Sequence, residues 1–367
     1  MNPPTYIVRL DGALTAETPL TTTPPALRGR PHDTDLPLPL PKMVVTYGDS
    51  RATVPYMPGS GIRGRLRRCG VDVVRRAMPE GLRLQDYYYL AIGGVKGADA
   101  ERKSDFAAAA ARRDVNPLIG LFGAGTPWMQ GRLSVSHAVP RTPVSEQSVT
   151  GARLDDIGGA GTAITLLRAE DQAQWIEMAF HNAERSRKDA MLRRLKGELA
   201  GRGRGSAADR SERQAGMETL SREIASHTAR TYAGLSVQRP LSGYEFIAPG
   251  TVLSQSMTLT HATVFEIGAF VAILRGFALN PVLGGKAAHG NGVVSAKWMV
   301  SVRESQASEM TRRGEIRLTP FEPLALNDAF LGKCAADFLT ALDAGRFDFT
   351  APAEREGDSD HNRHSPR

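Results

Sequence analysis

Six segments of regular hydrophobic spacing follow one another along the chain, and their order limits the possible folds more than any other feature. Strand-like alternation of apolar and polar residues comes first, then apolar residues at helical spacing, then two more alternating segments. A long apolar helical segment and a last alternating one complete the series. In order, these segments are 6–10, 62–73, 131–139, 252–261, 263–279 and 293–302.

That order, βαββαβ, is typical of the ferredoxin-like fold, in which two helices cover one face of a four-stranded antiparallel sheet. The predicted fold class is therefore α+β, with an RRM-like core. Many unrelated proteins share this fold, so it does not decide the function by itself. Aromatic residues make up only 6% of the chain, and the Lys/Arg-Gly-Phe/Tyr signature of RNA-recognition modules is missing. Stacking of bases on the sheet is therefore not expected to dominate.

Composition indicates a soluble protein of one or two domains. The chain has 367 residues, of which 41% are hydrophobic, and contains no apolar run near the length of a membrane span. Its first residues lack the features of a signal peptide, which predicts a cytoplasmic location. Cys69 and Cys334 are the only cysteines and lie far apart, so the sequence predicts neither a disulfide framework nor a zinc cluster.

Positive charge is concentrated in one part of the chain. The net charge is +7 and the calculated pI is about 9.6, which permits an acidic polymer as a partner. Residues 51–76 contain seven arginines and a single acid, Asp72. This segment carries most of the excess charge.

The turn at 58–61 leads directly into this arginine-rich helix. Ser60 is the predicted N-cap. Arg63, Arg65 and Arg67 oppose the helix dipole, which favours acidic side chains near a helix start. A bound phosphate would satisfy both the free backbone N–H groups and the guanidinium groups. The sequence therefore predicts an anion site here.

A glycine-rich loop at 284–292 joins the second predicted helix to the last strand. It does not match a Walker A loop, because Ala287 follows the Gly-Lys pair where Ser or Thr is required. Its flexible backbone carries Lys286, His289 and Asn291, which suit a close approach to phosphates or ribose. The alternative is a simple helix-to-strand connection.

Two insertions interrupt the predicted core. Residues 21–54 are rich in proline and are expected to form an extended loop that could lie on a partner. Residues 140–243 include two charged helical segments, 169–199 and 209–230, joined by a glycine-arginine hinge. They form either a solvated hairpin with salt-bridged faces or a basic arm that holds nucleic acid or a neighbouring subunit. A polar tail, 351–367, is expected to be disordered.

Little in the sequence points to catalysis. The eight histidines show no metal-binding spacing, and no serine lies in a GxSxG motif. No metal or cofactor is therefore expected. Asp33 and Asp35 lie on the proline-rich loop, where a carboxylate could act as a general base on a scissile phosphate.

Five short motifs resemble those of the RAMP superfamily of CRISPR proteins, in the same order along the chain. The turn at 58–64 resembles its PGSS-like turn and helix, and 284–292 resembles its C-terminal glycine-rich loop. The other three motifs are Leu121-Phe122-Gly123, the thumb-like segment 149–155, and the return strand 244–251. The closest match is the repeated right-hand backbone subunit, and the large charged insertion suggests the type IV variety.

This resemblance implies a palm formed by 1–139 and 244–350, with a thumb and helical insertion at 140–243. It further implies that copies of the protein stack helically along a guide RNA, with other CRISPR effector subunits and possibly a target nucleic acid as partners. The RNA-backbone roles that it implies fall on Arg63, Arg65, Arg67, Arg153, Lys286, His289 and Asn291, with Ser60 at the helix start.

The sequence thus favours a non-catalytic protein that binds single-stranded RNA through its phosphates and oligomerises on it. Type III relatives carry a catalytic aspartate in a glycine-containing context, which the segment around Asp33 lacks. The first alternative is nevertheless an endoribonuclease of the same superfamily that uses Asp33 or Asp35. The second is a structural assembly protein whose arginines pair with acidic neighbours.

Overall fold

The computed structural model describes residues 4–24, 27, 37–78, 80–94, 106–125, 128–149, 165, 167–201, 207–230 and 243–352. The chain forms two compact units. Unit 1 combines Met1–Thr150 with Ser242–Arg367, and unit 2 is Gly151–Leu241. Asp33, Asp35, Arg153 and the predicted tail after residue 352 lie outside the described residues.

Unit 1 is built on a seven-stranded antiparallel sheet. Its strand order is β13-β12-β11-β1-β10-β6, and β7 also pairs with β10. The four strands β11-β1-β10-β6 are those of the predicted βαββαβ core, so the α+β class and the antiparallel sheet are confirmed. The strands are β1 Tyr6–Ala16, β6 Leu133–Val135, β7 Val139–Pro140, β10 Val252–Ala262, β11 Val294–Glu304, β12 Thr311–Leu318 and β13 Ala325–Asn327.

Buried residues alternate with more exposed ones along these segments, which explains why they form strands. On β10, Leu253, Met257 and Leu259 are fully buried on one side, as the sequence predicts. Strands β1 and β11 approach each other especially closely at Gly12, where a Cβ atom would lie 1.9 Å from the Lys297 carbonyl oxygen. Only glycine allows this pairing without a shift of the backbone.

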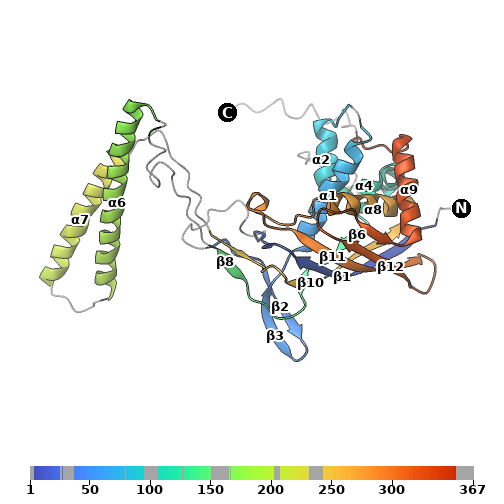
Figure 1. The fold of residues 1–367 in the computed structure, drawn as a ribbon, viewed down its shortest axis with the longest axis horizontal. Coiled ribbons are helices and arrows are strands. Elements are labelled where there is room, and N and C mark those ends of the chain that lie inside the picture. Colours follow the sequence, from blue (N-terminus) through green and yellow to red (C-terminus); the bar gives the residue numbers. More distant parts are fainter. Residues whose placement is uncertain are drawn as a thin grey trace. The chain divides into compact units, whose positions relative to one another are not determined.

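Three helices lie on one face of the sheet: α1 Gly59–Arg75, α8 Val264–Ala278 and α9 Ala329–Asp343 (Figure 1). Helix α8 begins with a capping box, in which Thr263 accepts from the Glu266 N–H and the Glu266 side chain accepts from the Thr263 N–H. Its Gly268 lies against the Cys334 carbonyl of α9, where a Cβ would be at 2.1 Å. Strands β12 and β13 and helix α9 extend the core beyond the elements that the sequence predicted.

The remaining elements of unit 1 are short. Helices α2, α3 and α4 follow α1 in the chain, and three two-stranded ladders lie outside the main sheet. They are α2 Leu84–Ile92, α3 Phe106–Val115, α4 Pro117–Phe122, η3 Ala287–His289, β2 Lys42–Tyr47 with β3 Ser50–Pro55, β4 Ala124–Gly125 with β5 Trp128–Met129, and β8 Gln147–Val149 with β9 Tyr244–Phe246.

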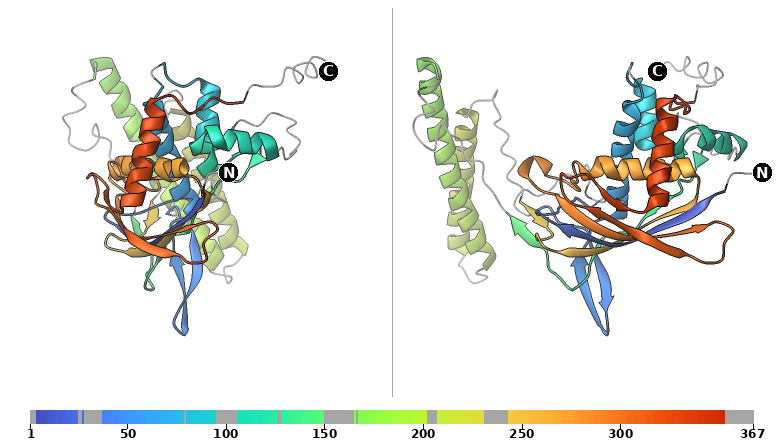
Figure 2. Two further views of the ribbon diagram at one scale, coloured as in Figure 1. Left: turned by 90° about the vertical axis from the view of Figure 1, so that its right-hand side faces the viewer. Right: turned by 45° about the vertical axis from the view of Figure 1, so that its right-hand side comes forward.

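The second half of the proline-rich insertion is a hairpin, not the expected extended loop. Strands β2 and β3 pair from Lys42 with Pro55 to Tyr47 with Ser50. A two-residue turn joins them, with Gly48 in the left-handed conformation that such turns require. The hairpin projects away from the side of the sheet that carries the helices (Figure 2). The Gly-Asp pair between two alternating segments was the signal for it.

The predicted strand at 131–139 is interrupted. Residues 136–138 separate β6 from β7, although both strands pair with β10. The Ser136 hydroxyl accepts from the Ser256 N–H and so takes the place of a backbone partner. His137 turns towards the start of α1 instead.

Unit 2 contains the two predicted charged helices, α6 Ala169–Gly201 and α7 Ala207–Arg230. His181 and His227 join them through a contact of 3.0 Å between their Nδ1 atoms, and Lys188 pairs with Glu223 at 2.7 Å. The contacts advance from residue 181 to 188 along α6 while their partners go back from 227 to 223 along α7, so the two helices run antiparallel. An ion pair therefore joins the two helices across the hairpin.

Candidate nucleic-acid interface

Helix α1 starts without the serine cap that the sequence predicts. Pro58, in an extended conformation, occupies the cap position and makes no side-chain cap. The Gly59 N–H donates to Nδ1 of His137 at 2.9 Å, and a Cβ on Gly59 would lie 2.3 Å from the Val135 carbonyl oxygen. A side chain from β6–β7 thus does what the cap was expected to do, and Ser60 is left exposed to solvent.

His137 is a residue that sequence reasoning missed. Its Nδ1 accepts a hydrogen bond, so the proton of the neutral ring lies on Nε2. The ring is exposed and lies 4.9 Å from that of Tyr56. An exposed donor therefore stands next to the helix start.

The arginines of the first turns of α1 point in two directions. Arg67 is 7% exposed, and its guanidinium donates to four backbone carbonyls. Arg63 donates to two, those of Leu133 and Phe122. The acceptors of Arg67 are the carbonyls of Tyr89, Leu90, Phe122 and Gly123, at 2.5–3.2 Å.

These carbonyls belong to the C-terminal ends of α2 and α4. Carbonyl groups in the last turn of a helix lack partners in the helix, and its dipole places negative charge there. Arg63 and Arg67 supply both the donors and the positive charge, and both guanidinium groups lie over the Phe122 ring, 5.4 and 5.8 Å from its centroid. The unfavourable helix start that the sequence revealed is therefore compensated largely from within the protein.

Burial lowers the pKa of Arg67 to about 10, and that of Arg63 is also lowered by burial. Arg67 nevertheless stays protonated at neutral pH. The predicted phosphate roles of Arg63 and Arg67 receive no support from this placement, because their donors face into the protein.

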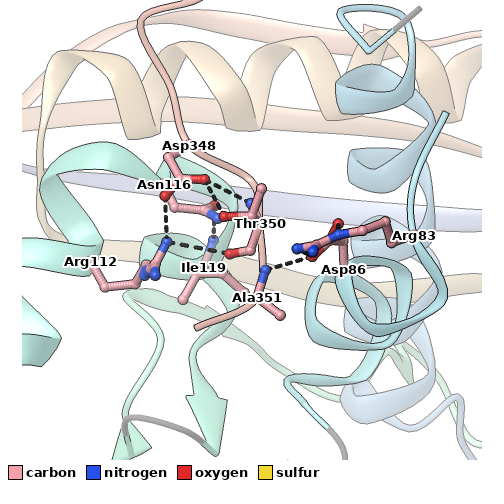
Figure 3. Close-up of polar contacts among 8 residues, drawn as sticks. All are labelled: Arg83, Asp86, Arg112, Asn116, Ile119, Asp348, Thr350 and Ala351. Carbon is pink, nitrogen blue, oxygen red and sulfur yellow. Dashed lines mark hydrogen bonds and ion pairs between the residues drawn. The ribbon is translucent and has the colours of Figure 1, made fainter. Parts of the chain in front are cut away.

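Polar contacts tie the segment 348–351 to α2 and α3, and a side-chain cap fixes the start of α4 (Figure 3). The buried Asp86 carboxylate of α2 accepts from Arg83 and from the Ala351 N–H. Arg112 binds Asp348 at 2.9 Å and also donates to the Thr350 carbonyl. The segment 348–351 is thereby fastened across α2 and α3, and the Asn116 side chain caps α4 through the Ile119 N–H.

Arg65 points the other way. It is partly exposed, and its terminal nitrogen donates to the Asn280 carbonyl at 3.0 Å. Its Nε atom is buried and has no partner among the described residues. Asn280 follows α8 and begins the connection that contains the glycine loop. Arg65 thus joins the two segments that the sequence singled out, and Arg68 lies exposed on the same helix.

The glycine loop is tied at its base. Bonds run from the Leu283 N–H to the Gly292 carbonyl and from the Gly285 N–H to the Thr21 carbonyl, both at 2.8 Å. Gly284 has φ +80°, and a Cβ there would lie 2.0 Å from the Thr21 carbonyl oxygen. The glycines therefore allow close contact with the chain that follows β1.

The three polar side chains of the loop have different environments. Asn291 is 4% exposed and donates to the Tyr244 hydroxyl at 2.8 Å. Lys286, in a left-handed conformation, has its ammonium 5.6 Å from the centre of the Tyr244 ring. His289 is exposed. Asn291 fastens the loop to β9, which leaves Lys286 and His289 for an external ligand. Tyr244 begins the return-strand motif 244–251, but the sequence did not predict its contact with the loop.

Among the described residues of the predicted site, Ser60, Arg65, Lys286 and His289 have polar groups that remain accessible. Strand pairing brings their segments to one end of the sheet: Ala16 pairs with Val294, directly after the loop, and β7, next to the start of α1, pairs with the beginning of β10. Their donors are of the kind that bind phosphate.

Within the described residues, no group of three or more His, Cys, Asp or Glu side chains could hold a metal ion. Cys69 and Cys334 are buried free thiols. None of the helices described is both long enough and apolar enough to cross a bilayer.

No protein-family model matches the sequence, and no curated protein matches it. Among solved structures, one similar chain is titled "Type IV-B CRISPR Complex", with a TM-score of 0.39 and 17% sequence identity. The match covers 82% of this chain and 92% of that chain.

Proposed function

We propose that this protein is a non-catalytic subunit that binds single-stranded RNA through its phosphates and assembles helically along a guide RNA in a type IV CRISPR effector complex. The order of RAMP-like motifs supports the family. The antiparallel βαββαβ core, which carries two of those motifs at one end of its sheet, agrees with it.

One observation carries the proposal. Arg65 on α1 is bonded to Asn280, which begins the connection to the glycine loop, and that loop presents Lys286 and His289 while Asn291 holds it to Tyr244. The cationic side chains of Arg65 and Lys286 thus belong to segments that are joined at Asn280, and the loop backbone around Lys286 is pre-organised and has little side-chain bulk. Such a surface suits a phosphate chain and offers nothing that would distinguish one base sequence from another.

RNA titrations at several salt concentrations test this function. Arg65→Gln should weaken binding to all sequences about equally and reduce the salt slope by roughly 0.7, the value for one lost phosphate contact on a single strand. Arg75→Gln is the matched control, because Arg75 is exposed in the last turn of the same helix and the charge change is identical. Equal effects of both variants would mean that only overall charge matters.

Assembly can be tested separately. Negative-stain images of purified protein with RNA should show helical filaments, and RNase treatment should shorten them. A protein that stays oligomeric without nucleic acid would instead support a structural assembly role. Incubation with RNA complementary to the bound guide completes the test, because regular cuts would favour an endoribonuclease.

A further inference from the structure

Phe321 has a backbone conformation that its side chain does not favour. It lies in the turn between β12 and β13 with φ +64°, in the left-handed region. Residues Thr319-Pro320-Phe321-Glu322 match a type II turn, with proline at the first central position and a 3.3 Å bond from the Glu322 N–H to the Thr319 carbonyl. The second central position of such a turn normally requires glycine or asparagine.

Packing of the side chain does not offset this backbone strain. The Phe321 side chain is 60% exposed, so its ring is not held by packing within the described structure. The backbone is held instead by a bond of 3.1 Å from the Phe321 N–H to the Ala278 carbonyl, at the end of α8. A bulky residue kept in a conformation that suits glycine, with its ring in solvent, indicates a role in contact with something outside the chain.

The position of the turn indicates which partner. Leu318, where β12 ends, pairs with Ala296 near the start of β11, so the turn lies at the same end of the sheet as the glycine loop. Ala278 is two residues from Asn280, which binds Arg65. Leu279 between them is 52% exposed. An exposed aromatic ring and an exposed aliphatic side chain thus lie beside the proposed phosphate contacts.

We propose that Phe321 is a stacking platform for a base of the bound single-stranded RNA, with Leu279 beside it. An aromatic ring next to a backbone-binding cation is the usual means by which proteins hold single strands without reading their sequence. This inference rests on the proposed function, to which it adds a base contact. Glu322 follows Phe321 in the chain, and its negative charge would repel a phosphate, which favours a neutral base face at this turn.

Titrations with two probes test the inference: a short oligouridylate, and an oligomer of the same length that has abasic sites throughout. Phe321→Gly removes the ring and suits the turn, so its melting temperature should stay within about 2 °C of the wild type. Its affinity for oligouridylate should fall roughly 5- to 160-fold, the range for one lost stack. The salt slope should not change, because no counterion release is lost.

Abasic RNA should bind the wild type and Phe321→Gly equally, and Phe321→Trp should keep the wild-type preference for RNA with bases. Phe106→Ala removes another highly exposed ring, on α3, and should change neither affinity.

If the wild type binds oligouridylate no better than abasic RNA, or if Phe321→Gly leaves this preference intact, the stacking role is wrong while RNA binding stands. If Phe321→Gly prevents oligomerisation without RNA but leaves affinity for RNA unchanged, the ring contacts another copy of the chain instead. If the wild type binds neither oligouridylate nor the abasic oligomer, the proposed function itself is wrong.

Discussion

The start of α1 and the glycine loop both look like phosphate sites in the sequence, yet the structure uses their polar groups differently. At α1, the guanidinium groups of Arg63 and Arg67 turn inward and bind the carbonyl ends of α2 and α4. In the loop, Asn291 is buried and hydrogen-bonded to Tyr244, whereas Lys286, which lies over the Tyr244 ring, and His289 remain accessible. A cationic side chain in a phosphate-binding motif is therefore available to a ligand only if it does not already donate to the carbonyls at the end of a neighbouring helix.

The largest effect should come from Arg67→Met. It leaves the carbonyls of Tyr89, Leu90 and Gly123 without their charged donor, while that of Phe122 keeps Arg63. We expect the free energy of unfolding to fall by at least about 3 kcal/mol in urea denaturation. Arg68→Met, at the exposed neighbouring position, should change it by no more than about 0.5 kcal/mol. If Arg67→Met were as stable as the wild type but bound RNA poorly, Arg67 would be a ligand residue after all.

Asp86→Asn should have the next largest effect, because Asp86 helps to hold α2, whose end binds Arg67. The hydrogen bond from Arg83 lowers the pKa of Asp86. Its contribution is therefore present above the unfolded pKa of about 3.9 and is lost as the pH falls through the lower folded value. We expect Asp86→Asn to reduce stability by about 1 kcal/mol at pH 7, with the difference from the wild type disappearing towards pH 2. A difference that did not vary with pH would exclude a role for the charge.

Asn291→Ala tests whether the loop has to be fastened. Loss of the bond to the Tyr244 hydroxyl should cost about 1 kcal/mol of stability and weaken RNA binding a few-fold. The salt slope should keep its wild-type value, because no charge is removed. Tyr244→Phe removes the same bond from the other side and should reproduce the result. A reduced salt slope in Asn291→Ala would instead show that the loss of the bond also displaces Lys286.

Lys286→Gln should have the smallest effect on stability, within about 0.5 kcal/mol, because its ammonium only lies over an aromatic ring at the surface. Its salt slope for RNA binding should be lower by roughly 0.7. Lys297→Gln is the matched control, because Lys297 is exposed on β11, where it pairs with Glu315. A reduced slope in the control but not in Lys286→Gln would move the interface from the loop to the sheet.

The spacing of hydrophobic residues was sufficient to predict the strands β1, β10 and β11 and the helices α1 and α8. Each of these elements is long enough for its buried face to repeat several times along the sequence. The spacing was less successful where elements are short or change direction. The hairpin at 42–55 was hidden among prolines, and His137 interrupts the strand at 131–139 by contacting Gly59. Strands β12 and β13 and helix α9, at 311–343, have similar hydrophobic spacing but lie outside the six predicted segments.

The sequence by itself determined the α+β core, the concentration of arginine at the start of α1 and the glycine loop that follows α8. Only the tertiary structure decided which of these side chains can reach a ligand. The physical reason is that Arg67 binds carbonyls more than 20 residues away in the chain. Their position depends on how α2 and α4 pack, and no local pattern around Arg67 contains that information.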